Sequence, residues 1–175
     1  EGSEPDLPAL VTGSHLDTVP TGGRFDGVLG VLAGLEAVHA LVDRGVQLRH
    51  PLELVAFADE ESTMVGCKGM AGSASLDPSA FTTSNGEPIQ KNLERIGGNW
   101  SELVSACRPD SAIAAFLELH VEQGAVLEQR AHAIGVVEGV VGQRRFTIHV
   151  SGQANHAGTT PMSMRQDALT AASRV

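Results

Sequence analysis

The sequence predicts an α/β fold in which a mostly parallel central sheet is flanked by helices. Two observations predict this fold. Apolar segments of strand length alternate with a segment of helical periodicity in the first half of the chain, which is typical of β-α-β units. Histidines and carboxylates follow three of the predicted strands, and functional groups of open α/β sheets gather where the strands end.

The first half of the chain contains the clearest elements. Residues 9–15 form a short apolar run of strand length, and residues 52–58 form a second. Between them a helix is predicted from Gly27 to Gly45, because apolar residues recur every three or four positions along one face. That face comprises Val28, Val31, Leu35, Val38 and Val42.

The second half predicts a short helix and then two strands, over residues 89–96, 114–121 and 145–150. A further helix is predicted to begin near Pro161. The earlier strands are apolar runs, whereas residues 145–150 alternate between apolar and polar side chains. This difference suggests a change of domain. We therefore expect residues 1–139 to be part of one domain and residues 140–175 to begin a second, α+β domain, with the chain a fragment of a longer protein.

The composition excludes several classes of function. The 175 residues carry 21 acidic and 12 basic side chains, a formal net charge of -9, without the basic run that nucleic-acid binding requires. No apolar stretch approaches the roughly 20 residues of a transmembrane helix. Cys67 and Cys107 do not form a disulfide framework. We expect a cytoplasmic protein with neither nucleic acid nor a membrane as partner.

Side chains that bind metal ions follow the predicted strands. They are His15, Asp17, Asp26, Glu60, Glu61 and His120. Because the ends of parallel strands meet at one edge of a sheet, these carboxylates would repel one another unless a cation neutralised them. Nitrogen and oxygen donors without thiolates suit zinc, with manganese and cobalt as alternatives.

The residue types suggest roles at such a site. Two neighbouring metal ions need a bridging carboxylate, and Asp26 is the natural bridge. Glu60 and Glu61 point in different directions at a strand end, so one can bind metal while the other takes a proton from water. Asp17 lies two residues beyond His15, where its side chain is expected to hold the second nitrogen of the imidazole.

Four segments carry a specific resemblance, because they occur together and in order. They are GSHLDTVPTGGRFDGVLGVL, FADEES, ELHVEQG and GQANHAGTTPM. With them the chain resembles the di-zinc amidase/hydantoinase/carbamoylase family of the aminoacylase/carboxypeptidase-type metallohydrolases. That family includes N-carbamoyl-L-amino-acid hydrolases, allantoate amidohydrolases and β-ureidopropionases, and the resemblance covers nearly the whole chain.

The resemblance implies a role for each matching residue of the metal centre. His15 and His120 would bind one of two metal ions, and Asp26 would bridge both. Glu61 would bind the other ion, Glu60 would be the general base, and Asp17 would lie behind His15. A cis peptide bond after Asp26 is also implied.

The resemblance further implies a catalytic domain over residues 1–139 and a lid or dimerisation domain from residue 140. Gln123 would lie near the substrate, and His156 of the lid would stabilise the oxyanion, often from the partner subunit of a homodimer. A fifth metal ligand and the groups that bind the substrate carboxylate would lie beyond Val175, so this chain alone should be inactive. The loop after Glu61 is shorter than is usual in the family, so the resemblance does not define the substrate side of the site.

The expected function is therefore metal-dependent hydrolysis of a linear amide or ureido C–N bond in a small amino-acid-like substrate. N-carbamoyl-L-amino acids are the preferred expected substrates, with allantoate and ureidopropionate as alternatives. Two other functions remain alternatives: a di-zinc aminopeptidase or deacylase, and a non-catalytic metal-binding or dimerisation module. Without the resemblance, His156 could merely hold its glycine-rich turn, and Glu118 and Glu122 are expected to be solvated.

Overall fold

The computed structural model describes all residues, 1–175. The chain divides into two compact units, Glu1–Arg130 and Ala131–Val175, and each is described by itself. The division falls before the predicted domain change near residue 140, and the assignment of the later residues to a lid stays a prediction. None of the helices is both long and apolar enough to cross a lipid bilayer.

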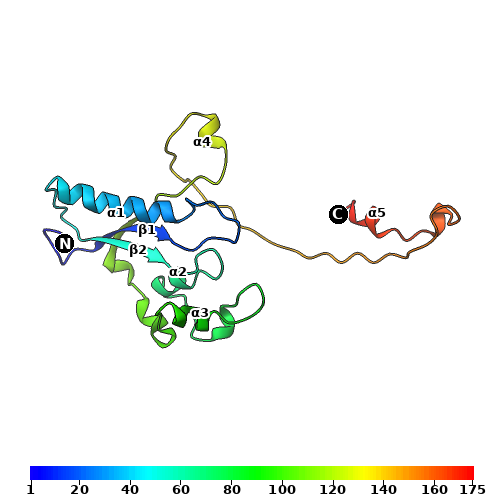
Figure 1. Cartoon of the computed structure of the whole chain (residues 1–175), viewed down its shortest axis with the longest axis horizontal. Coiled ribbons are helices and arrows are strands. Elements are labelled where there is room, and N and C mark those ends of the chain that lie inside the picture. The colour runs from blue at the N-terminus through cyan, green and yellow to red at the C-terminus, as the bar shows by residue number, and fades with distance from the viewer. The chain divides into compact units, whose positions relative to one another are not determined.

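A three-stranded parallel sheet forms the centre of the first unit (Figure 1). Its strands are β1 (Ala9–His15), β2 (Leu52–Phe57) and β3 (Ile113–Leu117), in the order β2-β1-β3. The predicted α/β class and the three strands are thereby confirmed, although β3 ends four residues earlier than predicted. β1 is central, so it is the most buried strand, with Val11 and Ser14 almost inaccessible to solvent.

Helix α1 (Val28–Asp43) joins β1 to β2 and confirms the predicted helix. Its buried face differs from the prediction, because it consists of Gly30, Val31 and Gly34. A side chain on Gly30 would overlap the Leu119 carbonyl, and one on Gly34 would lie 2.6 Å from Leu54 Cδ1. The helix backbone therefore approaches the strands through glycine, and the flanking apolar residues Leu35 and Val42 are exposed.

A small apolar cluster packs the segment between β2 and β3. This segment contains α2 (Val65–Met70), α3 (Gln90–Arg95) and the 3₁₀ turns Pro78–Ala80, Trp100–Ala106 and Asp110–Ala112, and lies across the strands from α1 in Figure 1. The cluster comprises Val65, Phe81, Ile89, Trp100 and Leu103. Phe81 meets Trp100 edge-on, with ring centroids 6.0 Å apart, and Trp100 Nε1 donates to the Leu76 carbonyl. This packing holds the turn that follows β2. The helix predicted over residues 89–96 is confirmed as α3.

The second unit contains little regular structure. The strand predicted over residues 145–150 is absent, and its alternating residues pair with no other strand, which an isolated strand needs for its backbone groups. The helix predicted near Pro161 is a 3₁₀ turn, Met162–Met164, followed by the short helix α5 (Ala168–Ala172). The remaining helix, α4 (Val126–Gln129), belongs to the first unit.

Gly13 provides a test of the central strand. Its φ of 145° disfavours a side chain, and a Cβ there would overlap the Val55 carbonyl of the paired strand β2. We expect Gly13→Ala to lower the free energy of unfolding by about 3 kcal/mol, measured by chemical denaturation of the full-length protein. Gly23→Ala is the matched control, because nothing lies within 4 Å of a Cβ there. Equal stability of the two variants would contradict this packing.

Candidate metal centre

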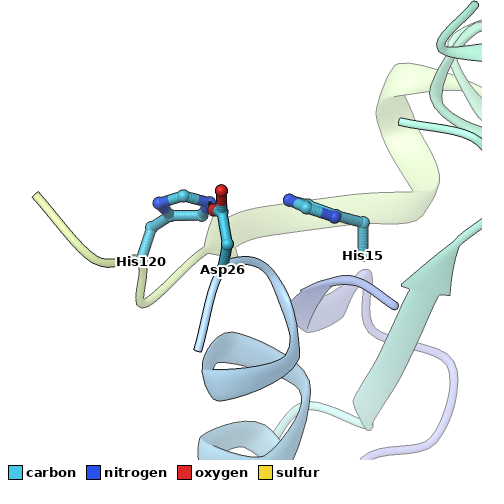
Figure 2. Close-up of side chains that lie close together, drawn as sticks. All are labelled: His15, Asp26 and His120. Atoms are coloured by element: carbon cyan, nitrogen blue, oxygen red, sulfur yellow. Dashed lines mark ion pairs between the residues drawn. The ribbon is translucent and has the colours of Figure 1, made fainter. Parts of the chain in front are cut away.

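Three side chains converge at the carboxyl ends of the parallel strands. His15 is the last residue of β1, Asp26 lies just before α1, and His120 follows β3. Their ligand atoms all lie within 4.8 Å of one another, and Figure 2 shows the Asp26 carboxyl group between the two imidazole rings. Donors that share one tetrahedral zinc ion lie about 3.4 Å apart, so side-chain shifts of about 1 Å would bring the three donors around one ion.

Both imidazoles are held by backbone carbonyl groups. His15 Nδ1 lies 2.7 Å from the Asp17 carbonyl oxygen, and His120 Nδ1 lies 2.8 Å from the Val121 carbonyl oxygen. Because a carbonyl oxygen only accepts hydrogen bonds, each Nδ1 carries the proton and donates. In the neutral ring, Nε2 then has a free lone pair, which is the form that binds a metal ion.

The Asp26 carboxylate has one satisfied and one unsatisfied oxygen. Oδ2 accepts a hydrogen bond from Gln123 Nε2 at 2.8 Å. Oδ1 is buried, has no hydrogen-bond partner, and lies 3.2 Å from His120 Nε2. A buried charged oxygen without a partner is costly, and the nearby Nε2 of a neutral imidazole is another acceptor. A cation among these atoms satisfies all of them, so the residues fit a divalent metal ion.

The two glutamates that follow β2 lie at the same edge. Glu60 Oε2 is 3.6 Å from His15 Nε2, on the side of the ring that presents the lone pair. Burial and the negative charge of Asp26 raise the pKa of Glu61 above its usual value, while His15 opposes the rise. Glu61 lies outside the group of three whose ligand atoms are closest.

Asp17 differs in detail from the prediction. Its carboxylate accepts hydrogen bonds from the backbone amides of Glu60 and Glu61, at 3.1 and 3.0 Å, and lies 3.9 Å from His15 Nδ1. The backbone carbonyl of Asp17, rather than its carboxylate, accepts the hydrogen bond from His15 Nδ1. Two backbone amides aimed at one carboxylate hold it more firmly than a single imidazole, so Asp17 joins the end of β1 to the glutamate turn.

The turn after β2 contains contacts that the sequence analysis missed. Thr63 donates to Asp59 Oδ2 through both its amide and its hydroxyl group. Asp59 and Met64 adopt left-handed backbone conformations, with φ of 54° and 59°, which are strained for residues other than glycine. An aspartate followed four residues later by threonine is a weak signal of such a turn. The turn fixes the direction in which Glu60 and Glu61 leave the strand.

Ser14 and Glu118 were also missed as a pair. The fully buried Ser14 hydroxyl donates to Glu118 Oε1 at 2.5 Å, so Glu118, which is exposed as expected, also has a bonded partner in the sheet. These residues lie next to His15 and two positions before His120, so their bond ties the two histidine-bearing segments together. Glu122 is exposed, as expected, and its carboxylate accepts hydrogen bonds from the amides of Val126 and Leu127 at the start of α4.

Gly27 brings the start of α1 against His15. Its φ is 66°, and a Cβ there would overlap the imidazole ring, so only glycine fits. No cis peptide bond is present, so the cis bond predicted after Asp26 is wrong. The left-handed conformation of Gly27 makes the sharp turn from Asp26 into α1 with a trans peptide bond.

Of the predicted site residues, seven lie in the first unit and His156 in the second. In the first unit the structure brings His15, Asp26 and His120 together, with Glu60, Glu61, Asp17 and Gln123 bonded to them or beside them. His156 accepts hydrogen bonds at Nδ1 from the Gly158 and Thr159 amides, at 3.1 and 3.2 Å.

Comparison with known proteins identifies the family. The sequence profile of the peptidase family M20/M25/M40 matches residues 11–175. The chain belongs to this family. Members of the family are metal-dependent in the typical case, which agrees with the donor group around Asp26.

Several relatives in the M20/M25/M40 family are named as amidohydrolases or amidases. The chain is 42% identical to an N-carbamoyl-L-amino-acid amidohydrolase of Paenarthrobacter aurescens, over 97% of this chain and 42% of that protein. It is 38% identical to an allantoate amidohydrolase of Escherichia coli, over 99% and 43%. A crystal structure of an amidase of the hydantoinase/carbamoylase family from Burkholderia multivorans matches with a TM-score of 0.76 and 37% identity, over 99% and 43%. The chain thus spans less than half the length of these relatives.

Asp26 provides the test of the metal centre. We expect Asp26→Ala to weaken zinc binding by more than the roughly 10–100-fold that is typical of residues behind the ligands, because it removes the central oxygen donor. Isothermal titration of the metal-free, full-length protein measures this affinity. His39→Ala is the control, because His39 is exposed on α1. Zinc affinity in Asp26→Ala equal to that of the wild type would rule out this centre.

Proposed function

We propose that the full-length protein is a two-metal amidohydrolase that cleaves a linear amide or ureido C–N bond of a small amino-acid-like substrate. The preferred substrates are N-carbamoyl-L-amino acids, with allantoate or ureidopropionate as alternatives. The observation that carries the proposal is the unsatisfied Asp26 Oδ1 between two imidazole nitrogens. The names of relatives at about 40% identity support the same chemistry.

The proposed metal ligands come from three segments. His15 and His120 would bind one ion through Nε2, Asp26 would bridge two ions, and Glu61 would bind the second. Zinc is preferred for this set of nitrogen and oxygen donors, and manganese or cobalt would accept the same set. Bound divalent ions would lower the pKa of a water molecule and polarise the substrate carbonyl group.

The chain's own residues would then move the protons. Glu60 would accept a proton from the attacking water at its carboxylate and return it to the leaving nitrogen. Its Oε2 is 3.6 Å from His15 Nε2, at the ligand side of that ring, which supports this role. The Asp17 carboxylate accepts hydrogen bonds from the Glu60 and Glu61 amides. It would thereby keep Glu60, the base, and Glu61, the metal ligand, pointing in different directions.

Substrate binding would involve Gln123 and His156. Gln123 is already at the centre, bonded to Asp26. His156 would donate from Nε2 to the oxyanion, since its Nδ1 accepts hydrogen bonds from two backbone amides.

We further propose a homodimer in which the second unit serves as the lid. We also propose a cytoplasmic location, where the two free cysteines would stay reduced.

Ammonia release tests the reaction. We expect the metal-loaded, full-length protein to release ammonia from N-carbamoyl-L-amino acids, allantoate or ureidopropionate, and a chelator to abolish that release. Release from one substrate alone would also identify the substrate. If metal is bound and no ammonia appears with any of them, the two-metal amidohydrolase is wrong, and an aminopeptidase, a deacylase or a binding module takes its place.

Glu60→Gln tests the general base separately from the metal. We expect this variant to keep the wild-type metal content and to lose about 100-fold or more in kcat, because general acid-base catalysis contributes roughly 10²–10⁴-fold. Glu36→Gln on the exposed face of α1 is the control and should leave kcat unchanged. Substantial turnover by Glu60→Gln would remove Glu60 from the base role.

A further inference from the structure

A single arginine braces the loop that carries His156 in the second unit. We propose that Arg165 is a positioning residue, which holds residues 156–160 in the one conformation that gives His156 a proton on Nε2. This inference rests on the proposed role of His156 as a hydrogen-bond donor to the oxyanion. It adds a residue that acts through His156 and that is distant from the metal centre in sequence.

The loop itself fixes the tautomer of His156. The amides of Gly158 and Thr159 both donate to Nδ1, at 3.1 and 3.2 Å. A nitrogen that accepts two hydrogen bonds carries no proton, so the proton of the neutral ring is on Nε2. The tautomer therefore depends on the direction of two backbone amides, and on whatever holds that stretch of backbone in place.

Arg165 holds the backbone of this loop at two points. Its Nε donates to the Thr160 carbonyl at 3.0 Å, and its Nη2 donates to the Ala157 carbonyl. These two carbonyls flank the amides that bind Nδ1. The loop also closes on itself, because the Thr160 hydroxyl donates to the His156 carbonyl at 2.7 Å. The planar, divergent donors of a guanidinium group suit such a two-point contact, and an ammonium group cannot reproduce it fully.

The rest of the second unit leaves space beside the loop. A hollow of about 420 Å³ is lined by residues that include Asn155, His156, Thr160, Arg165 and Asp167. It is closed on one side where Gly152 packs against the Gln166 carbonyl, without room for a side chain. His156 therefore faces a cavity that can admit a ligand, while two donor nitrogens of Arg165 are occupied by the loop. The geometry gives Arg165 a positioning role.

The experiment uses the full-length, metal-loaded protein with ¹⁵N-labelled histidine. Nitrogen-15 chemical shifts distinguish a protonated from an unprotonated ring nitrogen, and His156→Ala assigns the His156 signals. We expect the wild type to show Nε2 protonated and Nδ1 unprotonated. Arg165→Ala should lose this preference, and Arg165→Lys should keep part of it. Arg174→Ala, at an exposed arginine of the same unit, should match the wild type.

Kinetics supply the second readout. Arg165→Ala should lower kcat by about tenfold or more, which is less than the 10²–10³-fold loss that is typical when an oxyanion donor is removed. In a His156→Ala background, Arg165→Ala should cause no further loss, because it acts through His156. Equal losses in both backgrounds would overturn the proposal, as would an unchanged His156 tautomer in Arg165→Ala.

The two readouts separate this inference from the proposed function. If His156→Ala alone leaves kcat unchanged, the oxyanion role of His156 fails, whatever Arg165 does. In that case the tautomer in Arg165→Ala still decides whether Arg165 positions the ring. A folding defect would appear as the loss of all histidine signals of the second unit, and Arg165→Lys, which keeps the charge, then provides the comparison of tautomer and kcat.

Discussion

The structure of the site depends on one electrostatic constraint. A buried carboxylate oxygen of Asp26 has no hydrogen-bond donor and faces the Nε2 atoms of His15 and His120. His15 and Asp26 are buried and His120 is exposed, and the unpaired acceptors of the buried pair raise the free energy of the folded chain unless a cation or protons join them. Burial raises the pKa of Glu61, and the negative charge of Asp26 adds to that rise.

Hydrogen bonds, most of them to backbone groups, hold these side chains in place against their repulsion. Carbonyl groups orient both imidazoles, Asp17 holds the Glu60 and Glu61 amides, and Ser14 joins β1 to Glu118 beyond β3. The Asp17 and Ser14 contacts each link two neighbouring strand ends, whereas the carbonyl contacts of the imidazoles are local. A site held in this way is preorganised, because these contacts fix the direction of the imidazoles and of the glutamate turn.

The sequence predicted the ligands better than their supports. His15, Asp26 and His120 were predictable because they follow apolar strands, and parallel strands bring such residues to one edge. The packing of α1 through Gly30 and Gly34 was not predictable from apolar periodicity, which favours large side chains. Neither the bonds from the Glu60 and Glu61 amides to the Asp17 carboxylate nor the Ser14–Glu118 bond has a sequence signal, because both depend on distances between strands. The strand predicted over residues 145–150 failed because alternation does not supply a pairing partner.

Anomalous diffraction from crystals of the full-length protein, grown with zinc and measured across the zinc absorption edge, tests the metal centre most directly. We expect two anomalous peaks beside Asp26, one of them within bonding distance of His15 Nε2 and His120 Nε2. Zinc bound elsewhere in the protein, with no peak beside Asp26, would contradict it.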